Sequence, residues 1–312
     1  MLNKSIKHIS KSAKHQKIRQ YTQTIFFILF IIAPIFNIFR FDLTLGNFIL
    51  FGYNWTLGLE DVIAGQAPTS DAVFNIIVRA FLPLLVIVLV FGWTSWKYGR
   101  FYCGWLCPHF SVVETINALM RVASGKFSIW DKKSNLQKVD GHVIKIKAYY
   151  WILVYAAVVL FALLWAVVFL TYLLPPKEIY FNLVTFNLTR NQILFIGVAT
   201  LLLSIEFMFA RHLFCRFGCA VGVFQSLIWM ANKRAIVVSF DRNNALQCQD
   251  CFNACDNECP MRLNPRSIKR RMFNCTECGV CLHACAQVQE TLNKNPVLRW
   301  RDGQSALQES DR

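Results

Sequence analysis

Cysteine spacing constrains this chain more than any other feature, because eight of its twelve cysteines lie in one stretch near the C-terminal end. The first run reads C-Q-D-C-F-N-A-C-D-N-E-C-P and the second reads C-T-E-C-G-V-C-L-H-A-C. The eight residues are Cys248, Cys251, Cys255, Cys259, Cys275, Cys278, Cys281 and Cys285. Runs of four thiols with two or three residues between them allow the sulfurs to converge on one iron–sulfur cluster. The stretch therefore predicts two [4Fe-4S] clusters.

The spacing also predicts which thiols act together. The second run has the C-x2-C-x2-C-x3-C spacing of bacterial ferredoxins, and the first run has one additional residue between Cys251 and Cys255. In two-cluster ferredoxins the last cysteine of each run ligates the other cluster. Carried onto this chain, the rule assigns Cys248, Cys251, Cys255 and Cys285 to cluster A, and Cys275, Cys278, Cys281 and Cys259 to cluster B.

Two other uses of paired cysteines fit less well. Zinc ribbons use two C-x2-C pairs, whereas this stretch has two runs of four. Disulfides belong to oxidising compartments, and the topology argued below places the stretch on the reducing side of a membrane.

Charge and hydrophobicity indicate a membrane protein. The chain of 312 residues is 55% hydrophobic and carries a formal net charge of +15. Its basic residues flank long apolar runs, and they do not accompany aromatic residues on a soluble face as in nucleic-acid-binding proteins. We therefore expect a membrane partner and no nucleic acid.

Four apolar runs are long enough to cross a hydrocarbon core of about 30 Å. They lie at about 21–38, 73–93, 148–174 and 192–210. The first follows a basic tail, residues 1–20, and no small-residue cleavage site follows it, so we interpret it as an uncleaved transmembrane helix rather than a signal peptide. The uncharged piece 43–59 is rich in glycine and asparagine, and we expect an interfacial or re-entrant segment there.

Basic residues set the orientation of these spans. The N-terminal tail, the 94–147 connection and the C-terminal tail from 211 contain 29 of the 33 Lys and Arg residues. The connections 41–72 and 175–191 contain only Lys177 and Arg190. The positive-inside bias therefore predicts that both termini and the ferredoxin segment are cytoplasmic. The sequence favours an all-α integral membrane domain of four transmembrane helices plus a small bacterial-type ferredoxin domain with two [4Fe-4S] clusters.

The other four cysteines form two C-x3-C pairs, each directly after an expected span. The first reads R-F-Y-C-G-W-L-C-P and contains Cys103 and Cys107, and the second reads R-H-L-F-C-R-F-G-C and contains Cys215 and Cys219. A shift of 112 residues superposes both cysteines and the span before them, which indicates an old duplication that brings the pairs together. Their chemistry stays open: a further iron–sulfur or other thiophilic metal site, dithiol–disulfide exchange, or inert packing.

Two charged residues lie inside the expected spans. Arg79 either lines a polar path or extends to the outer headgroups. Glu206 either carries protons during quinol oxidation or faces Arg211 or Arg216 at the membrane interface. None of the six histidines lies inside a span, which excludes a haem held by two histidines within the membrane.

The C-x3-C-P motif, its second copy and the double cluster run together resemble the membrane-bound polyferredoxins of the NapH type, which are related to NosR-type and CcoG-type proteins. The resemblance covers residues 20–290 and is most specific at 103–108. It departs from the family pattern at Ala220 and Ala286, where the family has proline. The additional extracytoplasmic domains of the NosR and CcoG types have no counterpart in this sequence.

These observations predict four segments: a basic cytoplasmic tail (1–20), a four-helix membrane domain with both C-x3-C pairs (21–235), a ferredoxin domain (236–290) and a polar tail (291–312). The resemblance implies a multi-pass protein of the bacterial inner membrane. It would be a redox subunit rather than a stand-alone enzyme, passing electrons from quinol or a cytoplasmic donor to a partner respiratory reductase. The alternative is a maturation factor that reduces a metal ion or disulfide during assembly of a metalloenzyme such as a copper oxidase.

Overall fold

The computed structural model describes residues 2–66, 68–131 and 145–310. It divides into two compact units, and each is assembled from separated parts of the chain. The first unit comprises Met1–Phe27, Thr94–Val158 and Ile205–Arg312, and the second comprises Ile28–Trp93 and Val159–Ser204. All twelve cysteines belong to the first unit. The C-x3-C pairs are therefore grouped with the ferredoxin segment, whereas we had expected them in the membrane domain.

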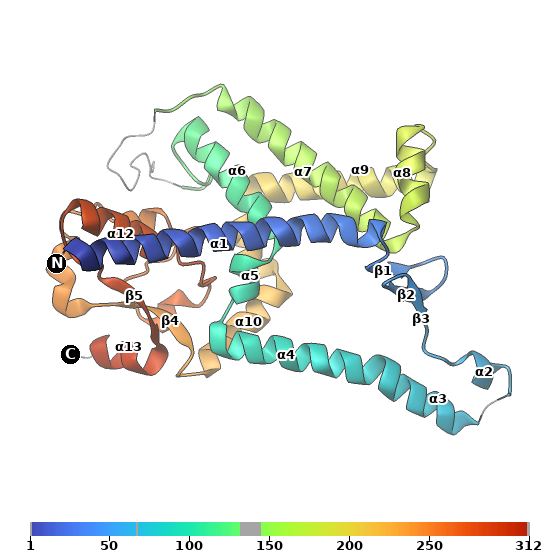
Figure 1. Ribbon diagram of the computed structural model, residues 1–312. Helices are drawn as coiled ribbons and strands as arrows, with labels where there is room; N and C mark the ends of the chain where they lie inside the picture. Colours follow the sequence, from blue (N-terminus) through green and yellow to red (C-terminus); the bar gives the residue numbers. More distant parts are fainter. Residues whose placement is uncertain (1, 67, 132–144, 311–312) are drawn as a thin grey trace. The chain divides into compact units, whose positions relative to one another are not determined.

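Helices dominate both units (Figure 1). The helices are α1 (Leu2–Ile35), α2 (Glu60–Ile63), α3 (Thr69–Ile76), α4 (Leu82–Tyr98), α5 (Phe101–Trp105), α6 (Pro108–Ser124), α7 (Tyr150–Leu173), α8 (Pro176–Val184), α9 (Arg190–Ile205), α10 (Ala220–Ala231), α11 (Ala254–Asn257), α12 (Val280–Thr291) and α13 (Gly303–Ser310). The strands are β1 (Phe39–Asp42), β2 (Asn47–Leu50), β3 (Tyr53–Trp55), β4 (Ile236–Phe240) and β5 (Leu298–Asp302). Three π-helical segments are Ile77–Phe81, Glu206–Ala210 and Phe214–Gly218, and two 3-10 segments are Arg242–Cys248 and Lys269–Met272.

Four helical stretches in the described residues are long and apolar enough to cross a membrane. They are Ser12–Ile35, Thr69–Tyr98, Tyr150–Leu173 and Arg190–Ala210, and each overlaps one of the four expected spans. The clearest is α7, whose 24 residues include no charged side chain. Residues 132–144, which we counted in the connection between the second and third spans, lie outside the described residues.

The second unit departs from the all-α expectation. Residues 39–55 form an antiparallel three-stranded sheet in the order β1-β2-β3 in place of an interfacial or re-entrant segment. The glycines that make this piece a poor helix serve as turn residues, because Gly46 and Gly52 adopt φ values of 66° and 82° between the strands. Arg79 donates to the Thr56 carbonyl beyond β3, at 3.5 Å, so its guanidinium binds a loop of this unit.

The core of the second unit lies between α7, α8 and α9. Ala166 and Leu170 of α7 pack against Ile179 of α8 and Ile196 of α9, and all four side chains are buried. The tyrosine hydroxyl of Tyr172 donates to the Phe30 carbonyl of α1 at 2.8 Å.

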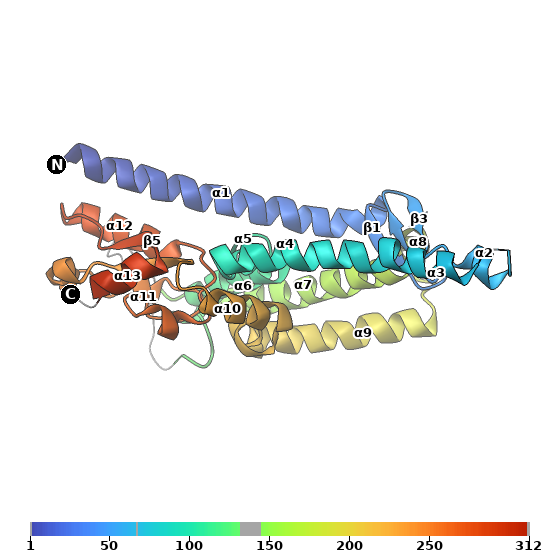
Figure 2. The same ribbon diagram turned by 90° about the horizontal axis from the view of Figure 1, so that it is seen from below.

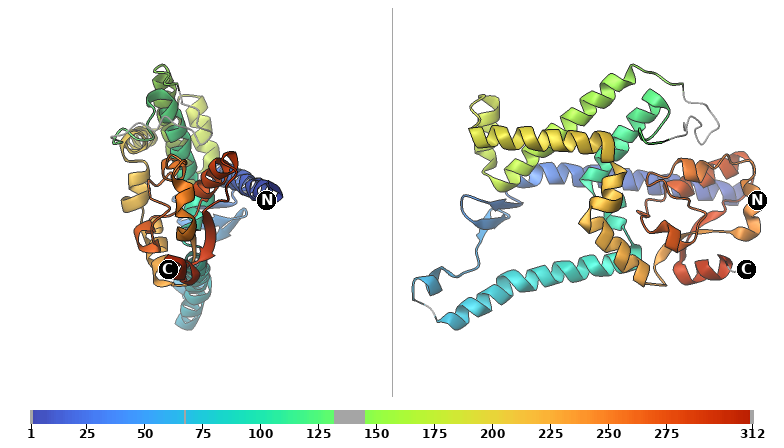
Figure 3. Two further views of the ribbon diagram at one scale, coloured as in Figure 1. Left: turned by 90° about the vertical axis from the view of Figure 1, so that its left-hand side faces the viewer. Right: turned by 180° about the vertical axis from the view of Figure 1, so that it is seen from behind.

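The first unit contains the ferredoxin segment, which extends beyond its expected end. Strand β5 pairs antiparallel with β4, from Ile236 opposite Asp302 to Phe240 opposite Leu298, and α13 packs on β4. Both β5 and α13 lie in the stretch 291–312 that we expected to be a polar tail. Figure 2 shows α11, α12, α13 and β5 grouped at the end of the unit where α1 begins. The view from behind in Figure 3 shows the same C-terminal elements beside the first turns of α1.

Candidate iron–sulfur centres

Backbone conformation brings the eight ferredoxin cysteines together. The residues in the left-handed region within the two cysteine runs are Phe252 (φ 48°), Asn253 (φ 56°), Glu277 (φ 51°) and Gly279 (φ 71°). These sharp turns reverse the chain within two or three residues, which a regular helix or strand cannot do. Helices carry three of the eight thiols, with Cys255 on α11 and Cys281 and Cys285 on α12.

The first cavity of the segment has a volume of about 270 Å³. Its cysteine lining consists of Cys248, Cys251, Cys255 and Cys285. The remaining lining is mainly apolar, with side chains such as Val288 and Leu298. Three of the four thiols, Cys248, Cys251 and Cys255, come from the first run, and Cys285 comes from the far end of the second run. The chain thus brings together the thiols expected for cluster A.

The second cavity has a volume of about 320 Å³. Its cysteine lining consists of Cys259, Cys275, Cys278 and Cys281, which are the thiols expected for cluster B. Met261, Leu263 and Met272 complete its apolar wall. Ligation by these two sets stays a prediction, but their residues fit the group. Each set offers four soft donors around a dry space, as a cubane cluster requires.

The protonation of these thiols fits the same chemistry. Burial raises the pKa of Cys275 and of Cys281 well above the usual range, and it raises the pKa of Cys259 to about 11. The free thiols are therefore protonated at neutral pH, and a cluster binds them by taking up thiolate and releasing protons. No three His, Cys, Asp or Glu side chains among the described residues converge closely enough to hold one metal ion. A cubane needs no such convergence, because each thiolate binds a different iron atom.

The two C-x3-C pairs also meet, and we call their four cysteines the C-x3-C set. Cys103 lies on α5, Cys215 lies in the π-helical segment Phe214–Gly218, and Cys107 and Cys219 are the N-cap residues of α6 and α10. All four are close enough to interact electrostatically through their thiols. The positive end of a helix dipole thus lies at the second cysteine of each pair.

This helix-cap position explains a departure noted in the sequence. Pro108 is the first residue of α6, where the fixed φ of proline suits a helix start. Ala220 occupies the same position in α10 and starts that helix without proline. Proline is favourable but not required there, so its loss leaves the second copy of the motif intact.

Polar side chains surround the C-x3-C set. The Cys103 thiol donates to Gln225 Oε1 at 3.1 Å, and Cys215 Sγ lies 3.5 Å from His109 Nδ1. The other ring nitrogen of His109 lies 2.9 Å from Glu206 Oε2. Glu206 thus pairs with a histidine that follows the first cysteine pair, whereas we expected Arg211 or Arg216 if it were an interfacial residue.

A buried arginine joins the C-x3-C set to the cluster B cavity. Arg100 is 0% exposed, and it donates to the Cys215 carbonyl and to Asn274 Oδ1, next to Cys275. Burial raises the pKa of the Cys103 thiol to about 12, and the Arg100 guanidinium opposes that shift. A side chain on Gly222 would clash with this guanidinium, so the glycine gives Arg100 its space.

The three thiol sets are continuous through apolar side chains. Cys215 and, at its edge, Cys107 pack in the same hydrophobic cluster as Cys259 and Cys275. A second hydrophobic cluster contains Cys281 of the cluster B cavity together with Cys255 and Cys285 of the cluster A cavity. The order is therefore C-x3-C set, cluster B cavity, cluster A cavity.

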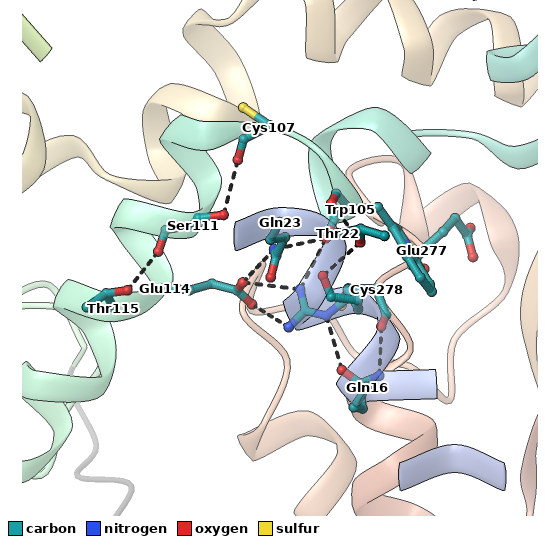
Figure 4. Close-up of polar contacts among 12 residues, drawn as sticks. Gln16, Thr22, Gln23, Trp105, Cys107, Ser111, Glu114, Thr115, Glu277 and Cys278 are labelled. Atoms are coloured by element: carbon teal, nitrogen blue, oxygen red, sulfur yellow. Dashed lines mark hydrogen bonds and ion pairs between the residues drawn. The ribbon is translucent and has the colours of Figure 1, made fainter. Parts of the chain in front are cut away.

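Sequence reasoning missed the residues that attach the first C-x3-C pair to the ferredoxin loop. The Trp105 indole donates to the Glu277 carbonyl at 3.1 Å, and a Cβ on Gly104 would clash with the Thr276 carbonyl oxygen. Arg19 and Glu114 form an ion pair at this junction, and Figure 4 shows the Glu114 carboxylate turned toward α1.

Known proteins share these features. The family model described as "4Fe-4S binding domain" matches twice, at residues 80–126 and 191–236. Each match contains one C-x3-C pair, which supports the duplication inferred from the sequence. No solved structure matches the chain.

Two curated proteins of Escherichia coli (strain K12) are similar to it. YccM, named for electron transport, is 24% identical over 235 residues, which cover 72% of this chain and 56% of YccM. NapH, named as a ferredoxin-type protein, is 20% identical over 261 residues, which cover 78% of this chain and 74% of NapH. The described helices, the cysteine sets and these matches agree with one another. The chain is similar to membrane-bound 4Fe-4S polyferredoxins of the NapH type, and the family-model matches and the NapH similarity support [4Fe-4S] clusters, in a number consistent with two.

Proposed function

We propose that this protein is a membrane-anchored relay that carries electrons between the membrane face and a partner redox protein. The observation that carries the proposal is the continuity of the three thiol sets through two shared hydrophobic clusters. A [4Fe-4S] cluster, when bound, exchanges one electron at a potential set by its ligands, hydrogen bonds and burial. The chain contributes those three factors, and it acts as a redox subunit rather than as a stand-alone enzyme.

The ligands follow from the cavities. Cluster A is held by the thiols that line the cavity of about 270 Å³, and cluster B by those that line the cavity of about 320 Å³. The C-x3-C set holds a third cluster, because both matches to the 4Fe-4S family model fall on it and its four thiols lie close enough to interact electrostatically. Disulfide exchange fits less well, since burial raises the pKa of Cys103, Cys107 and Cys215 and the thiolate is the nucleophile.

The relay lies on the cytoplasmic side of the bacterial inner membrane. The basic residues of the expected inside segments support this orientation through the positive-inside bias. Both C-x3-C pairs directly follow apolar helices that end at Tyr98 and Ala210. The C-x3-C set is therefore the station closest to the membrane, where quinol is the donor of suitable solubility.

The partner meets the relay at cluster A. Cys248 is only partly buried, whereas the seven other ferredoxin cysteines are buried. Leu246 and Phe252, on either side of it in sequence, are 75% and 66% exposed. Exposed apolar side chains next to a cluster suit docking of a redox protein. A respiratory reductase subunit is the partner that this reading favours.

The test is an anaerobic count of iron and acid-labile sulfide in the detergent-purified protein. The relay predicts about twelve iron atoms per chain, falling to about eight when the C-x3-C cysteines are replaced by serine. Addition of a short-chain quinol should then reduce the clusters, as followed by electron paramagnetic resonance (EPR). About eight iron atoms in both forms, with turnover of copper(II) or a disulfide, would instead support a maturation factor. Bound zinc with almost no iron would overturn the cluster assignment.

A further inference from the structure

An ion pair of a buried arginine and a half-buried glutamate lies beside the loop of the cluster B cavity. Arg19 on α1 is 5% exposed, and its guanidinium binds both carboxylate oxygens of Glu114, at 3.0 Å and 3.1 Å. The same guanidinium donates to the Gly104 carbonyl at 3.2 Å, between the first two C-x3-C cysteines. A two-pronged contact of this kind fixes the positions of both charges.

Direct contacts attach this ion pair to the loop that carries Cys278. Gln16, one helical turn before Arg19, donates to the Cys278 carbonyl at 2.9 Å. Gln16 also accepts from Arg19 Nε at 3.1 Å, so a chain of two hydrogen bonds joins the guanidinium to that loop. Figure 4 shows Gln16 close to Cys278, with Glu114 on the opposite side of the group.

The two charges have opposite signs, and the hydrogen bonds of Gln16 hold the Arg19 guanidinium next to the loop that carries Cys278. The site is largely removed from water, so salt screens these charges less than it screens surface charges. Reduction adds a negative charge to a cluster. A nearby cation therefore favours the reduced state, and a nearby anion disfavours it.

We propose that the Arg19–Glu114 pair sets the reduction potential of cluster B, with Arg19 raising it and Glu114 lowering it. The inference rests on the proposed function, because it takes the four thiols of the second cavity as ligands of cluster B. On this proposal, α1 has a second role besides anchoring the protein in the membrane. The cytoplasmic part of this helix tunes the middle station of the relay, between the C-x3-C set and cluster A.

Cluster A provides a matched control within the same chain. Its neighbouring ion pair is Arg266 with Asp256, whose nitrogen and oxygen lie 2.6 Å apart. Both charges act on the Cys255 thiol. The Arg266 side chain is 26% exposed, whereas that of Arg19 is 6% exposed. Solvent therefore screens the pair at cluster A more strongly, and neutralising it should have the smaller effect.

The experiment is an EPR-monitored redox titration of the full-length protein in detergent, in wild type and four variants. Arg19→Gln should lower the midpoint potential of cluster B and leave cluster A unchanged. Glu114→Gln should raise it, and the double variant should return close to the wild-type value. Arg19→Lys keeps the charge without the two-pronged contact, and it should stay near the wild-type value.

Opposite shifts distinguish tuning from a merely structural role, because a loosened loop would move the potential in the same direction in both single variants. Shifts in one direction, equal shifts of clusters A and B, or unmoved potentials would overturn the inference. If Arg19→Gln loses cluster B altogether, the midpoint potentials of Glu114→Gln and Arg19→Lys still test whether the charges tune cluster B. Iron and sulfide counts accompany each sample. Wild-type protein without clusters would overturn the proposed function, whereas intact clusters with unmoved potentials would overturn only this inference.

Discussion

The two copies of the C-x3-C motif match the same family model and have different surroundings. In the first copy, Gly104 and Trp105 are buried against the ferredoxin loop. A shift of 112 residues places Arg216 and Phe217 at the equivalent positions of the second copy, and Phe217 is 68% exposed. The first copy therefore combines two tasks, supplying thiols and binding the cluster B loop. The second copy supplies thiols and, through the Cys215 carbonyl, an acceptor for Arg100.

The arginine before each pair shows the same divergence. Arg100 bonds to Cys215 O and Asn274, between the C-x3-C set and the cluster B cavity. Arg211 bonds instead to Asn117 on α6 and to the Phe127 carbonyl. Arg211 also has a φ of 42°, which the two π-helical segments on either side accommodate. The 112-residue shift aligns Arg100 with His212 rather than with Arg211, so each copy has a buried arginine before its pair at a different position and with different partners.

The largest expected effect tests whether the two copies build one site. Replacing Cys103 and Cys107 by serine, or Cys215 and Cys219 by serine, should each remove about four iron atoms per chain. The reason is that a cubane held by four thiols is not retained by two. Iron and sulfide analysis of both variants measures this. Loss of iron from one variant only would mean that the copies do not share a cluster.

The next effect tests the tight contact of the first copy. Gly104→Ala places a methyl group against the Thr276 backbone, and we expect destabilisation by about 1–3 kcal/mol, as for other overpacked sites. The equivalent change in the second copy, Arg216→Ala, should cost less than about 1 kcal/mol because it removes no contact with the ferredoxin loop. Thermal unfolding of both variants checks this. Equal losses would mean that the second copy also binds a neighbouring element.

A third prediction concerns pH. Burial raises the pKa of Cys103 to about 12 and that of Cys248 to about 11, so both thiols are protonated at neutral pH without iron. Cluster binding must release these protons, so cluster affinity should rise with pH and fall on acidification. Each thiol that loses a proton contributes about a tenfold change per pH unit. Competition with an iron chelator, at pH values from about 6 to about 9, measures how cluster affinity changes with pH. A flat profile would contradict the buried, protonated thiols.

The smallest effect tests the hydrogen bond of Trp105. Trp105→Phe keeps an aromatic ring and removes the donor to the Glu277 carbonyl, which should cost about 1 kcal/mol. Phe217→Leu, at the equivalent position of the second copy, should be nearly neutral because that ring is exposed. Denaturant unfolding of the two variants side by side provides the measurement. A larger loss of stability for Phe217→Leu than for Trp105→Phe would mean that the second copy, not the first, makes the structural contact.

Local patterns predicted the parts of this molecule that depend on spacing. The crossed sets of four thiols, with Cys285 joining the first run and Cys259 the second, line the two cavities as the ferredoxin spacing indicated. The four apolar stretches were also evident. The sheet of residues 39–55 was missed, because its glycines were weighed as helix breakers and not as turn residues. Strand β5 was missed because its partner, β4, lies about sixty residues earlier in the chain.

The amino-acid sequence alone determined the chemistry of this protein. Ligand type and spacing are local properties, so the cysteine runs already implied clusters, and hydrophobic length already implied helices that can cross a membrane. Only the tertiary structure decided which charges stand beside the thiols. Arg19 and Cys278 lie far apart in sequence, and so do Arg100 and Asn274. The burial of such charges is a property of packed surfaces, and no single stretch of sequence contains both sides of the contact.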